Sequence, residues 1–426
     1  MKKLLITGGA RLSGTVRIHG AKNSVLPVLA ACCLCTSPCV LHNCPDIEDV
    51  RTALAILESL GCKTRREGST LCIDASGLSK FCVEKRLAGK MRSSILFLGA
   101  LLARCGKAEL ALPGGCPLGE RPIDLHVKSL AKLGARFRFE KGILQAAWRE
   151  RRDGDIFLSI PSVGATENLL LACALGSGTV TLHGAAREPE ITDLIGFLRA
   201  AGADIRGAGT SELTICGAHK LHGATYTILP DRIETATYLC MAAGCGGEVE
   251  LQRCDGRLLA PVIERLREAG CELRSVGSEI ALKSSGKLTA VSPVTTAPYP
   301  GFPTDAQAIL MAAVLRAKGE SVFQETVFER RFLHVPELQK LGADIVLSGK
   351  TARVRGVAHL HGAMLRAEDL RGAAALITAG LLAEGESEVL GLSHLARGYE
   401  SLEQNLKNLG AAIKSVDIPA PFVYNT

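Results

Sequence analysis

The apolar and polar positions of this 426-residue chain repeat with a period of about 70 residues. Each copy has a run that is apolar on nearly every side, a short run of β type, and an amphipathic run. The amphipathic runs end in one phrase, Leu or Ala, then glycine, then a small residue, with the glycines at Gly61, Gly134, Gly202, Gly270, Gly342 and Gly410. A glycine at this place is typical of a helix with a left-handed C-terminal cap. The pattern therefore indicates one folding unit in six copies.

The first run of each copy predicts a buried helix, because apolar residues occupy all of its faces. A strand follows, as at 108–112 or 180–183, then the amphipathic helix, then two alternating strands, for example 225–229. The predicted fold class is α/β, with six repeated αβαββ units, about twelve helices, and the buried helices inside the sheets. Because 426 residues exceed one ordinary core, we expect two domains of three units each.

The N-terminal strands predicted over 4–19 resemble the strands that precede two later units, LHGATYTILP and LHGAMLRAED. We therefore expect residues 1–20 to close a discontinuous domain formed with residues 230–426. Residues 21–229 would form the second domain, and the chain would cross between domains near Gly20 and Pro230.

Composition narrows the class of protein. A net charge of +7 without a basic stripe, and only 4% aromatic residues, argue against a nucleic-acid partner and favour a small polyanionic ligand. The start MKKLLITGG is too short for a signal sequence, and the longest apolar run, 25–35, is too short for a bilayer. These features predict a cytoplasmic protein with no membrane partner.

The sixteen cysteines are scattered through apolar positions, which is typical of reduced core residues. The cluster at Cys32, Cys33, Cys35, Cys39 and Cys44 allows two interpretations, a zinc site or an apolar segment. It lacks a pair of CxxC motifs and a histidine at ligand spacing, so we expect no metal there.

Polar and charged residues gather where the buried helices are predicted to start, and in the loops before the amphipathic helices. A helix start favours anions, and arginines at equivalent corners suit phosphates and carboxylates, so the pattern predicts an anion-binding cleft. The residues are Lys22, Asn23, Arg92, Ser162, Val163, Gly164, Asp231, Arg232, Thr304, Asp305, Asp369 and Arg371, with Cys116, Arg121, Asp124, Arg187, Glu188, Arg331 and Arg397 in the loops.

The loop 112–126, LPGGCPLGERPIDLH, differs most from the repeat. Its glycines predict a pliant tip, and Cys116 lies on that tip, outside any apolar run. A solvated thiol keeps a pKa of about 8.5 and can act as an acid. The positive charge of Lys22 or Arg121 nearby would lower this pKa and make the thiol a better nucleophile. A surface cysteine on a turn is the alternative.

Ten motifs resemble the enolpyruvyl transferases that act on UDP-N-acetylglucosamine, the UDP-N-acetylglucosamine 1-carboxyvinyltransferases. They cover the chain in order: AKN at 21–23, KMRSS at 90–94, the loop at 112–126, PSVGATEN at 161–168, AAREPEI at 185–191, LPDRIET at 229–235, FPTDAQA at 302–308, TVFERRFLHVPEL at 326–338, DLR at 369–371 and RGYE at 397–400. Ile160, Glu120 and Ala396 depart from the family's pattern.

The resemblance implies a two-domain inside-out α/β barrel that transfers the enolpyruvyl group of phosphoenolpyruvate to the 3-hydroxyl of UDP-N-acetylglucosamine. This step opens peptidoglycan synthesis, releases phosphate, needs no cofactor, and is blocked when fosfomycin alkylates the loop cysteine. Cys116 matches that acid or covalent residue and Asp305 the base, with Lys22 and Arg397 also catalytic. The positions implied to bind substrate are Lys22, Asn23, Arg92, Arg121, Pro122, Ile123, Asp124, Leu125, Ser162, Val163, Gly164, Asp305, Val327, Arg331, Asp369 and Arg371.

Several of these residues also have structural interpretations. Asp369 is interpreted as a helix cap that holds Arg371, and Asp231 with Arg232 as a capping pair at the crossing. Asp124 and His126 could serve only to orient the loop, and Arg187 with Glu188 could form an ion-pair corner.

Two other functions stay open. The sister enolpyruvyl transferase of the shikimate pathway shares the fold but acts without a loop cysteine, and an inactive paralogue could bind UDP-sugar as a regulator. We expect a monomer or weak homo-oligomer.

Overall fold

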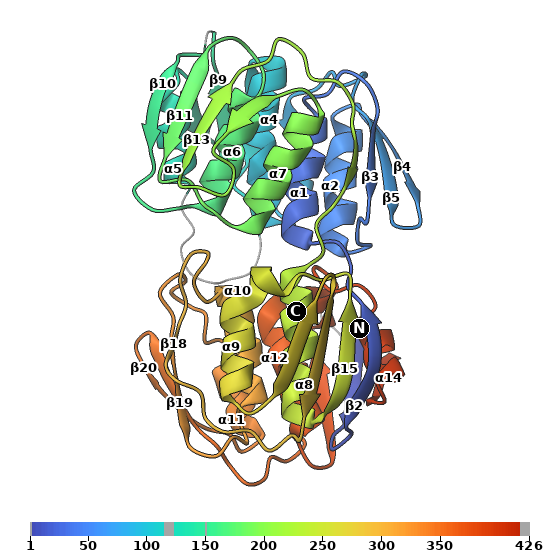
Figure 1. The fold of residues 1–426 in the computed structure, drawn as a ribbon. Helices are drawn as coiled ribbons and strands as arrows, with labels where there is room; N and C mark the ends of the chain where they lie inside the picture. The colour runs from blue at the N-terminus through green and yellow to red at the C-terminus, as the bar shows by residue number, and fades with distance from the viewer. Residues whose placement is uncertain (1, 115–122, 150, 418–426) are drawn as a thin grey trace, which may run out of the picture. The chain divides into compact units, whose positions relative to one another are not determined.

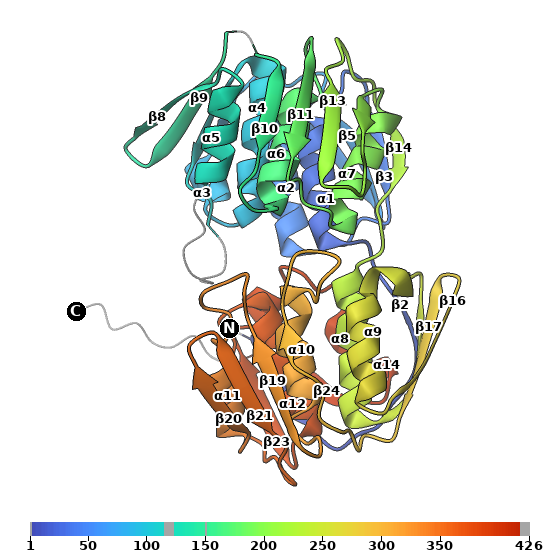
Figure 2. The same ribbon diagram turned by 60° about the vertical axis from the view of Figure 1, so that its left-hand side comes forward.

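A computed structural model describes residues 2–114, 123–149 and 151–417 (Figure 1). The described chain divides into two compact units. The central unit contains residues from 19 to 231, and the terminal unit contains residues 2–18 and 232–417. Each unit holds three four-stranded sheets, and in each a group of buried helices runs through the middle while the sheets lie outside them (Figures 1 and 2).

The three inner helices of the central unit are almost entirely buried and contact one another. They are α1 (Lys22–Cys32), α4 (Leu96–Cys105) and α6 (Val163–Cys173). The amphipathic helices outside them are α2 (Glu48–Ser59), α5 (Asp124–Lys132) and α7 (Pro189–Ala200), and the short elements α3 (Lys85–Ala88) and η1 (Arg92–Ile95) precede α4.

Every sheet of the central unit has the same order: an edge strand, its parallel neighbour, and two antiparallel strands. The first sheet is β14 (Thr225–Thr227), β3 (Cys39–His42), β5 (Thr70–Asp74) and β4 (Lys63–Glu67). The second is β6 (Cys82–Val83), β7 (Lys107–Ala111), β9 (Ile143–Ala147) and β8 (Arg136–Glu140). The third is β10 (Gly154–Phe157), β11 (Thr179–His183), β13 (Glu212–Cys216) and β12 (Asp204–Arg206).

The terminal unit repeats this plan. Its inner helices are α8 (Arg232–Cys245), α10 (Thr304–Ala313) and α12 (Leu370–Leu382), its outer helices are α9 (Ala260–Glu268), α11 (Val335–Lys340) and α14 (Leu402–Asn408), and two short helices are η2 (Gly256–Leu259) and α13 (Leu392–Leu395).

The N-terminal strands complete two sheets of the terminal unit. β2 (Leu12–Arg17) is the parallel edge strand beside β15 (Gly247–Gln252), and β1 (Lys2–Thr7) lies between two strands that come from the end of the chain. The three sheets, in spatial order, are β16 (Glu272–Val276), β17 (Glu279–Ser284), β15 and β2; β18 (Val294–Thr295), β19 (Glu320–Gln324), β21 (Thr351–Arg355) and β20 (Asp344–Ser348); and β22 (Met364–Arg366), β23 (Glu386–Leu390), β1 and β24 (Ala412–Asp417).

The six repeat glycines have φ angles between 91° and 105°, so each ends its helix in the left-handed conformation as predicted. The fold class of six repeated αβαββ units is confirmed. The prediction of twelve helices missed α3 and α13, which are single turns in the described chain, because four residues carry too little periodicity to be recognised.

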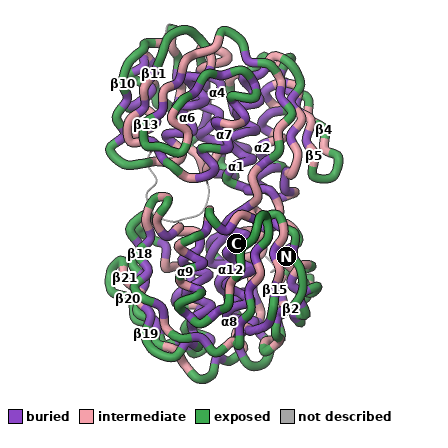
Figure 3. Tube along the Cα trace, in the orientation of Figure 1, coloured by how far each residue is buried: buried purple, intermediate pink, exposed green. Residues whose placement is uncertain are grey.

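Buried residues fill the centre of each unit (Figure 3). Close helix contact depends on Gly99 of α4, where an added Cβ would lie 2.3 Å from the backbone oxygen of Asn168 in α6. Most of the fifteen described cysteines belong to this interior, including the whole cluster from Cys32 to Cys44, and all fifteen are free thiols. Their interpretation as reduced core residues is therefore confirmed for the ten buried cysteines, whereas Cys72, Cys105, Cys216 and Cys245 are half-buried and Cys82 is exposed.

No helix among the described residues combines the length and apolar content that a bilayer crossing requires. No group of three or more His, Cys, Asp or Glu side chains is arranged to hold a metal ion within the same residues.

Candidate active site

Asp305 lies at the first turn of α10, in the terminal unit, next to two buried arginines. Its Oδ1 accepts a hydrogen bond from Arg331 Nη2 at 2.6 Å and lies 3.5 Å from Arg371 Nε. Arg331 also donates from Nε and Nη2 to the backbone oxygen of Thr304, at 3.3 and 3.1 Å. The Asp305 carboxyl remains 30% exposed, so the anion is fixed on one side and accessible on the other.

Neighbouring positive charges determine the protonation state of the Asp305 carboxyl. Burial raises the pKa of Asp305, but the guanidinium groups of Arg371 and Arg331, with a weaker contribution from Arg232, outweigh burial and hold it well below its usual range. Asp305 is therefore a fixed anion at neutral pH.

Asp369 is the N-cap of α12. Its Oδ1 accepts hydrogen bonds from the backbone N–H groups of Arg371 and Gly372, both at 3.0 Å, and lies 4.0 Å from Arg331 Nη1. The interpretation of Asp369 as a helix cap is confirmed. With Asp305, Arg331 and Arg371 it forms what we call the arginine–aspartate cluster.

Arg371 is held by packing as well as by charge. Its guanidinium lies 5.4 Å from the ring centroid of Tyr399, and the Tyr399 hydroxyl shares a hydrogen bond of 2.8 Å with Thr237 of α8. All three inner helices of the terminal unit therefore contribute to the position of this cation.

Glu325, at the end of β19, is a residue of this site that the sequence analysis missed. It is 1% exposed, and its Oε1 accepts hydrogen bonds from Thr296 Oγ1 and from the backbone N–H groups of Val327 and Phe328, at 2.8–3.0 Å. Its Oε2 accepts from Thr304 Oγ1 at 2.9 Å. One carboxylate thus joins the segment of Val327 to the start of α10, beside Asp305.

Two further predicted residues of the terminal unit are accessible. Val327 is 43% exposed in the loop that Glu325 orders. Arg397 is half-buried between α13 and α14, and its charge, together with burial, lowers the pKa of His394.

In the central unit, Lys22 is the first residue of α1 and is 8% exposed. Its Nζ lies 2.7 Å from Asp49 Oδ2 of α2, and its backbone N–H donates to Asp231 Oδ2 at 3.1 Å. Asp231 therefore binds the start of α1, at the crossing between the units. Asn23, next along the helix, is exposed.

Ser162 is the N-cap of α6, where its hydroxyl accepts a hydrogen bond of 3.4 Å from the N–H of Ala165. Val163 and Gly164 form the first turn, and all three are only partly buried. The unpaired N–H groups of a helix start, without an acidic residue in the first turn, favour a bound anion.

His126 joins the start of α5 to α6 and α4. Asn168 Nδ2 donates to His126 Nδ1 at 2.8 Å and to the backbone oxygen of Ile95 at 2.8 Å, while Asn168 Oδ1 accepts from Gly99 N–H at 2.6 Å. Because Nδ1 accepts, the imidazole proton is on Nε2, beside Gly164. The role predicted for His126, to orient its segment, fits these contacts.

The half-buried residues Ile123, Asp124 and Leu125 precede His126, and Asp124 pairs with Lys128 at 3.0 Å. Arg92 is half-buried at the start of η1. Arg187 is exposed and donates from Nε to the backbone oxygen of Gly209 at 3.2 Å. Cys116, Arg121 and Pro122 lie outside the described residues.

The stability of the central unit should fall with acidification because of His126. Burial, with the charge of Arg92, lowers the pKa of His126 from 6.5 to about 4, so between these values the unfolded chain binds the proton that the folded chain excludes. The stabilisation is complete above pH 6.5, and about 3 kcal/mol of it should be lost as pH falls to 4. The measurement is urea unfolding followed by the fluorescence of Trp148, the chain's single tryptophan.

The matched variants are His126→Gln and His219→Gln, the second on an exposed turn. Between pH 7 and 4, His126→Gln should lose this part of the pH dependence and His219→Gln should keep it. Equal pH dependence in wild type and His126→Gln would contradict the assignment.

Comparisons with known proteins identify the class. The sequence model of the family described as EPSP synthase (3-phosphoshikimate 1-carboxyvinyltransferase) matches residues 6–406. The enolpyruvyl transferase NikO from Streptomyces tendae superposes with a TM-score of 0.89 at 30% identity, over 98% of this chain and 99% of that one. An EPSP synthase from Acinetobacter baumannii has a TM-score of 0.72 at 18% identity, over 98% and 100% of the two chains, and so shares the fold.

This chain therefore belongs to the EPSP synthase family of enolpyruvyl transferases. Curated relatives then place it more closely. It is 46% identical over 413 residues to UDP-N-acetylglucosamine 1-carboxyvinyltransferase 2 of Caldanaerobacter subterraneus subsp. tengcongensis, covering 97% of this chain and 99% of that protein. It is 47% identical over 412 residues to UDP-N-acetylglucosamine 1-carboxyvinyltransferase of Gloeobacter violaceus, covering 96% and 90%. The resemblance predicted from the motifs is confirmed.

Proposed function

We infer that the chain transfers the enolpyruvyl group of phosphoenolpyruvate to the 3-hydroxyl of UDP-N-acetylglucosamine and releases phosphate, as the first committed step of peptidoglycan synthesis. In the addition step, the hydroxyl oxygen bonds to C2 of phosphoenolpyruvate while C3 gains a proton. In the elimination step, C3 loses a proton and the C2–O bond to phosphate breaks. The observation that carries this assignment is near-full-length identity of 44–47% to relatives that bear this name.

The arginine–aspartate cluster would meet the acceptor hydroxyl. One oxygen of Asp305 is engaged by Arg331, which leaves the exposed side of the carboxylate to accept a hydrogen bond from the sugar. A carboxylate of such low pKa is a weak base before reaction, so it orients the hydroxyl and takes the proton late, when the attacking oxygen has become acidic. Asp369 would hold Arg331 and Arg371 in place, and Val327 would contact the sugar.

The central unit would supply anion recognition. The buried ammonium of Lys22 and the guanidinium groups of Arg92 and Arg121 suit the phosphate and carboxylate of the donor. Ser162, Val163 and Gly164 at the start of α6, with Pro122, Ile123, Asp124 and Leu125, would bind the uridine diphosphate. Arg397, in the terminal unit, and Asn23 complete the proposed set.

Cys116 would be the acid at C3 or a covalent residue. Its support is the sequence of the loop 112–126, in which a thiol follows two glycines. We expect fosfomycin to add one adduct, found on Cys116 by peptide mass spectrometry. An adduct found only on another of the sixteen cysteines would contradict this role.

Phosphate release from phosphoenolpyruvate tests the function. Release should require UDP-N-acetylglucosamine and should not occur with shikimate 3-phosphate. Release with shikimate 3-phosphate alone would assign the sister reaction, and release with neither acceptor would favour a regulator that binds UDP-sugar.

Glu325→Gln should impair the binding of the acceptor, UDP-N-acetylglucosamine, more than the binding of the donor, phosphoenolpyruvate. An amide has one acceptor oxygen in place of two. Either the Thr304 hydroxyl must turn to accept from the amide, or the backbone N–H groups of Val327 and Phe328 lose their acceptor, so the link between the loop of Val327 and α10 is weakened. We expect a KM for UDP-N-acetylglucosamine raised about tenfold and kcat lowered about tenfold, with little change in KM for phosphoenolpyruvate. Steady-state kinetics with each substrate varied measures this.

The control is Glu320→Gln on the same strand, an exposed glutamate that pairs with Arg353 and Arg355. It should leave all three constants near wild type. Equal effects of Glu325→Gln on the two KM values would indicate a general loss of structure and contradict the positioning role.

We also propose that residues 1–20 with 230–426, and residues 21–229, are the two domains that close over the substrates. Charged nucleotide and phosphoenolpyruvate substrates favour a cytoplasmic enzyme, acting as a monomer or weak homo-oligomer. Size-exclusion chromatography with light scattering tests the oligomeric state.

A further inference from the structure

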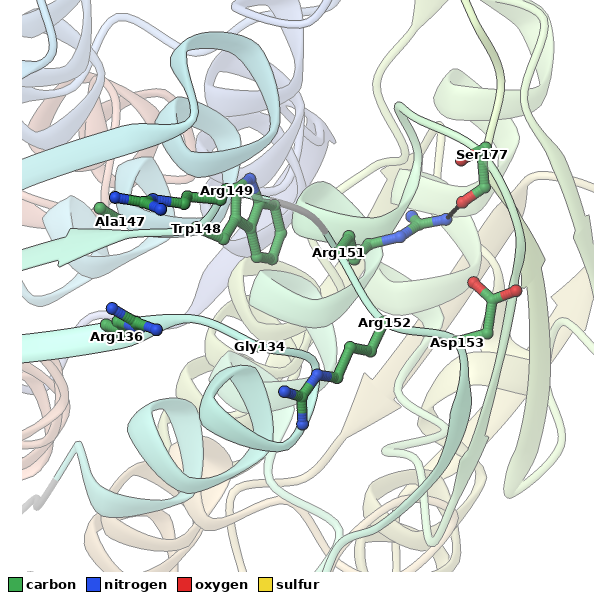
Figure 4. A pocket seen from close by; sticks show the side chains of 9 residues that line it. All are labelled: Gly134, Arg136, Ala147, Trp148, Arg149, Arg151, Arg152, Asp153 and Ser177. Carbon is green, nitrogen blue, oxygen red and sulfur yellow. Dashed lines mark hydrogen bonds between the residues drawn. The ribbon is translucent and has the colours of Figure 1, made fainter.

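A cavity of about 790 Å³ lies in the central unit, apart from every residue discussed as a catalytic or substrate residue. It is lined by Gly134 and Arg136, by Ala147, Trp148 and Arg149, by Arg151, Arg152 and Asp153, and by Ser177 (Figure 4). These residues come from the turn after α5, from β8, from the end of β9 and the segment between β9 and β10, and from the loop before β11. The volume is that of a site for a small molecule.

The cavity lies at the opposite end of α6 from the proposed diphosphate site. Gly134 follows the C-terminus of α5, and Ser177 follows the C-terminus of α6, whereas Ser162 begins α6. Eleven residues of helix span about 16 Å, so the cavity and the start of α6 are two distinct places in the central unit.

Its lining is strongly basic, with four arginines against one aspartate. Arg136, Arg149 and Arg152 are not joined by an ion pair or side-chain hydrogen bond to any residue in the described part of the chain. Both Arg149 and Arg152 are exposed. Three guanidinium groups at one cavity, without a protein partner among the described residues, favour the binding of an anion.

Arg151, in contrast, holds the segment between β9 and β10 against the end of α6. Its Nη1 donates to the backbone oxygens of Cys173, at 2.6 Å, and Leu175, at 3.2 Å, and its Nη2 donates to those of Ser177 and Gly178. It therefore caps the C-terminus of α6. Figure 4 shows its side chain directed toward Ser177, whereas that of Arg152 extends toward Gly134. The Nε of Arg151 is buried without a hydrogen-bond partner among the described residues.

Trp148 adds an aromatic surface between the arginines. Its backbone N–H donates to Gly106 at 3.0 Å, its ring packs partly against the hydrophobic core, and the rest of it lines the cavity (Figure 4). A fixed indole ring beside arginines can stack on a nucleobase, and such stacking contributes about 1–3 kcal/mol.

We propose that this cavity binds a nucleoside di- or triphosphate, with the base on Trp148 and the phosphates on Arg136, Arg149 and Arg152. Several uncommitted cations require a ligand with more than one phosphate charge, because a single phosphate monoester would leave some of them unneutralised. The indole ring favours a ligand that also has an aromatic ring. The low aromatic content of the chain favours a free nucleotide over a nucleic-acid strand.

The test uses the full chain and ATP without magnesium as the probe. Trp148 is the only tryptophan, so its fluorescence, excited where nucleotides and tyrosines do not absorb, reports on this cavity alone. ATP should quench it saturably at micromolar to submillimolar concentration, and equilibrium dialysis with labelled ATP should give the same affinity. Adenosine and pyrophosphate should each bind at least tenfold more weakly than ATP. Adenosine has no phosphates for the arginines, and pyrophosphate has no base to stack on Trp148.

Variants locate the ligand. Arg149→Gln and Arg152→Gln should each weaken ATP binding at least tenfold. Arg138→Gln, on β8 but paired with Glu140 at 3.3 Å, should not. The proposal is overturned by an absence of ATP binding up to millimolar concentration in both assays, by unchanged binding in the two cavity variants, or by pyrophosphate binding as tightly as ATP. None of these outcomes depends on enolpyruvyl transfer.

Discussion

Asp305→Asn is expected to lower kcat about a thousandfold, because the amide can neither accept the proton of the attacking hydroxyl nor neutralise the arginines that face it. General acid–base groups contribute roughly 10²- to 10⁴-fold, which sets the scale. Arg331 and Arg371 hold the carboxylate at 2.6 and 3.5 Å, so it is fixed in place to receive the proton late in the reaction despite its low basicity. The measurement is kcat from phosphate release at saturating substrates, with the affinity for UDP-N-acetylglucosamine measured in parallel.

Asp344→Asn is the matched control, since Asp344 is an exposed aspartate of the same unit that lies 3.8 Å from Arg355. It should retain wild-type kcat. The acid limb of the wild-type pH–rate profile should not report Asp305, because its pKa is held below the usual range of a carboxyl. A kcat for Asp305→Asn within tenfold of wild type would contradict its role in the proton transfer.

Lys22→Gln is expected to reduce both catalysis and stability, for two separate reasons. Loss of a fixed ammonium at the donor should lower kcat/KM about 10²- to 10³-fold. Loss of the buried partner of Asp49, at 2.7 Å, should lower the free energy of unfolding by about 3–5 kcal/mol. Phosphate-release kinetics and urea unfolding measure the two effects independently.

The double variant Lys22→Gln/Asp49→Asn separates the effect on catalysis from the effect on stability. Neutralising Asp49 removes the buried charge that faces Lys22 in the wild type, so stability should largely return while activity stays low. The control is Arg51→Gln. Arg51 lies in α2 and forms an exposed ion pair with Asp46, so its loss should change kcat/KM and the free energy of unfolding little. Recovery of activity along with stability in the double variant would show that Lys22 acts only as a structural cation.

Local chemistry explains what the sequence predicted well. The repeat glycines end their helices because only a residue without a side chain adopts positive φ at low cost, and that signal needs no knowledge of distant contacts. Asp369 was recognisable as an N-cap for the same reason, since its hydrogen bonds reach only two and three residues ahead.

Contacts between distant residues explain what the sequence did not reveal. Glu325 binds Thr296, 29 residues away, and Asp49 binds Lys22, 27 residues away, so each partner becomes apparent only when the units fold. One signal was present for Asp49: it lies on the buried stripe of α2 with Ala53 and Ile56, where an aspartate needs a partner. Trp148 and its arginines gave no such signal, because they follow one another in a loop without periodicity.

The central claim is that this chain transfers the enolpyruvyl group of phosphoenolpyruvate to a UDP-sugar. A competition experiment tests it most directly: phosphoenolpyruvate with equal amounts of UDP-N-acetylglucosamine and shikimate 3-phosphate, and mass spectrometry of both acceptors. The account predicts that only the UDP-sugar gains the enolpyruvyl group, with one phosphate released for each transfer. An unmodified UDP-sugar beside a modified shikimate 3-phosphate would contradict it.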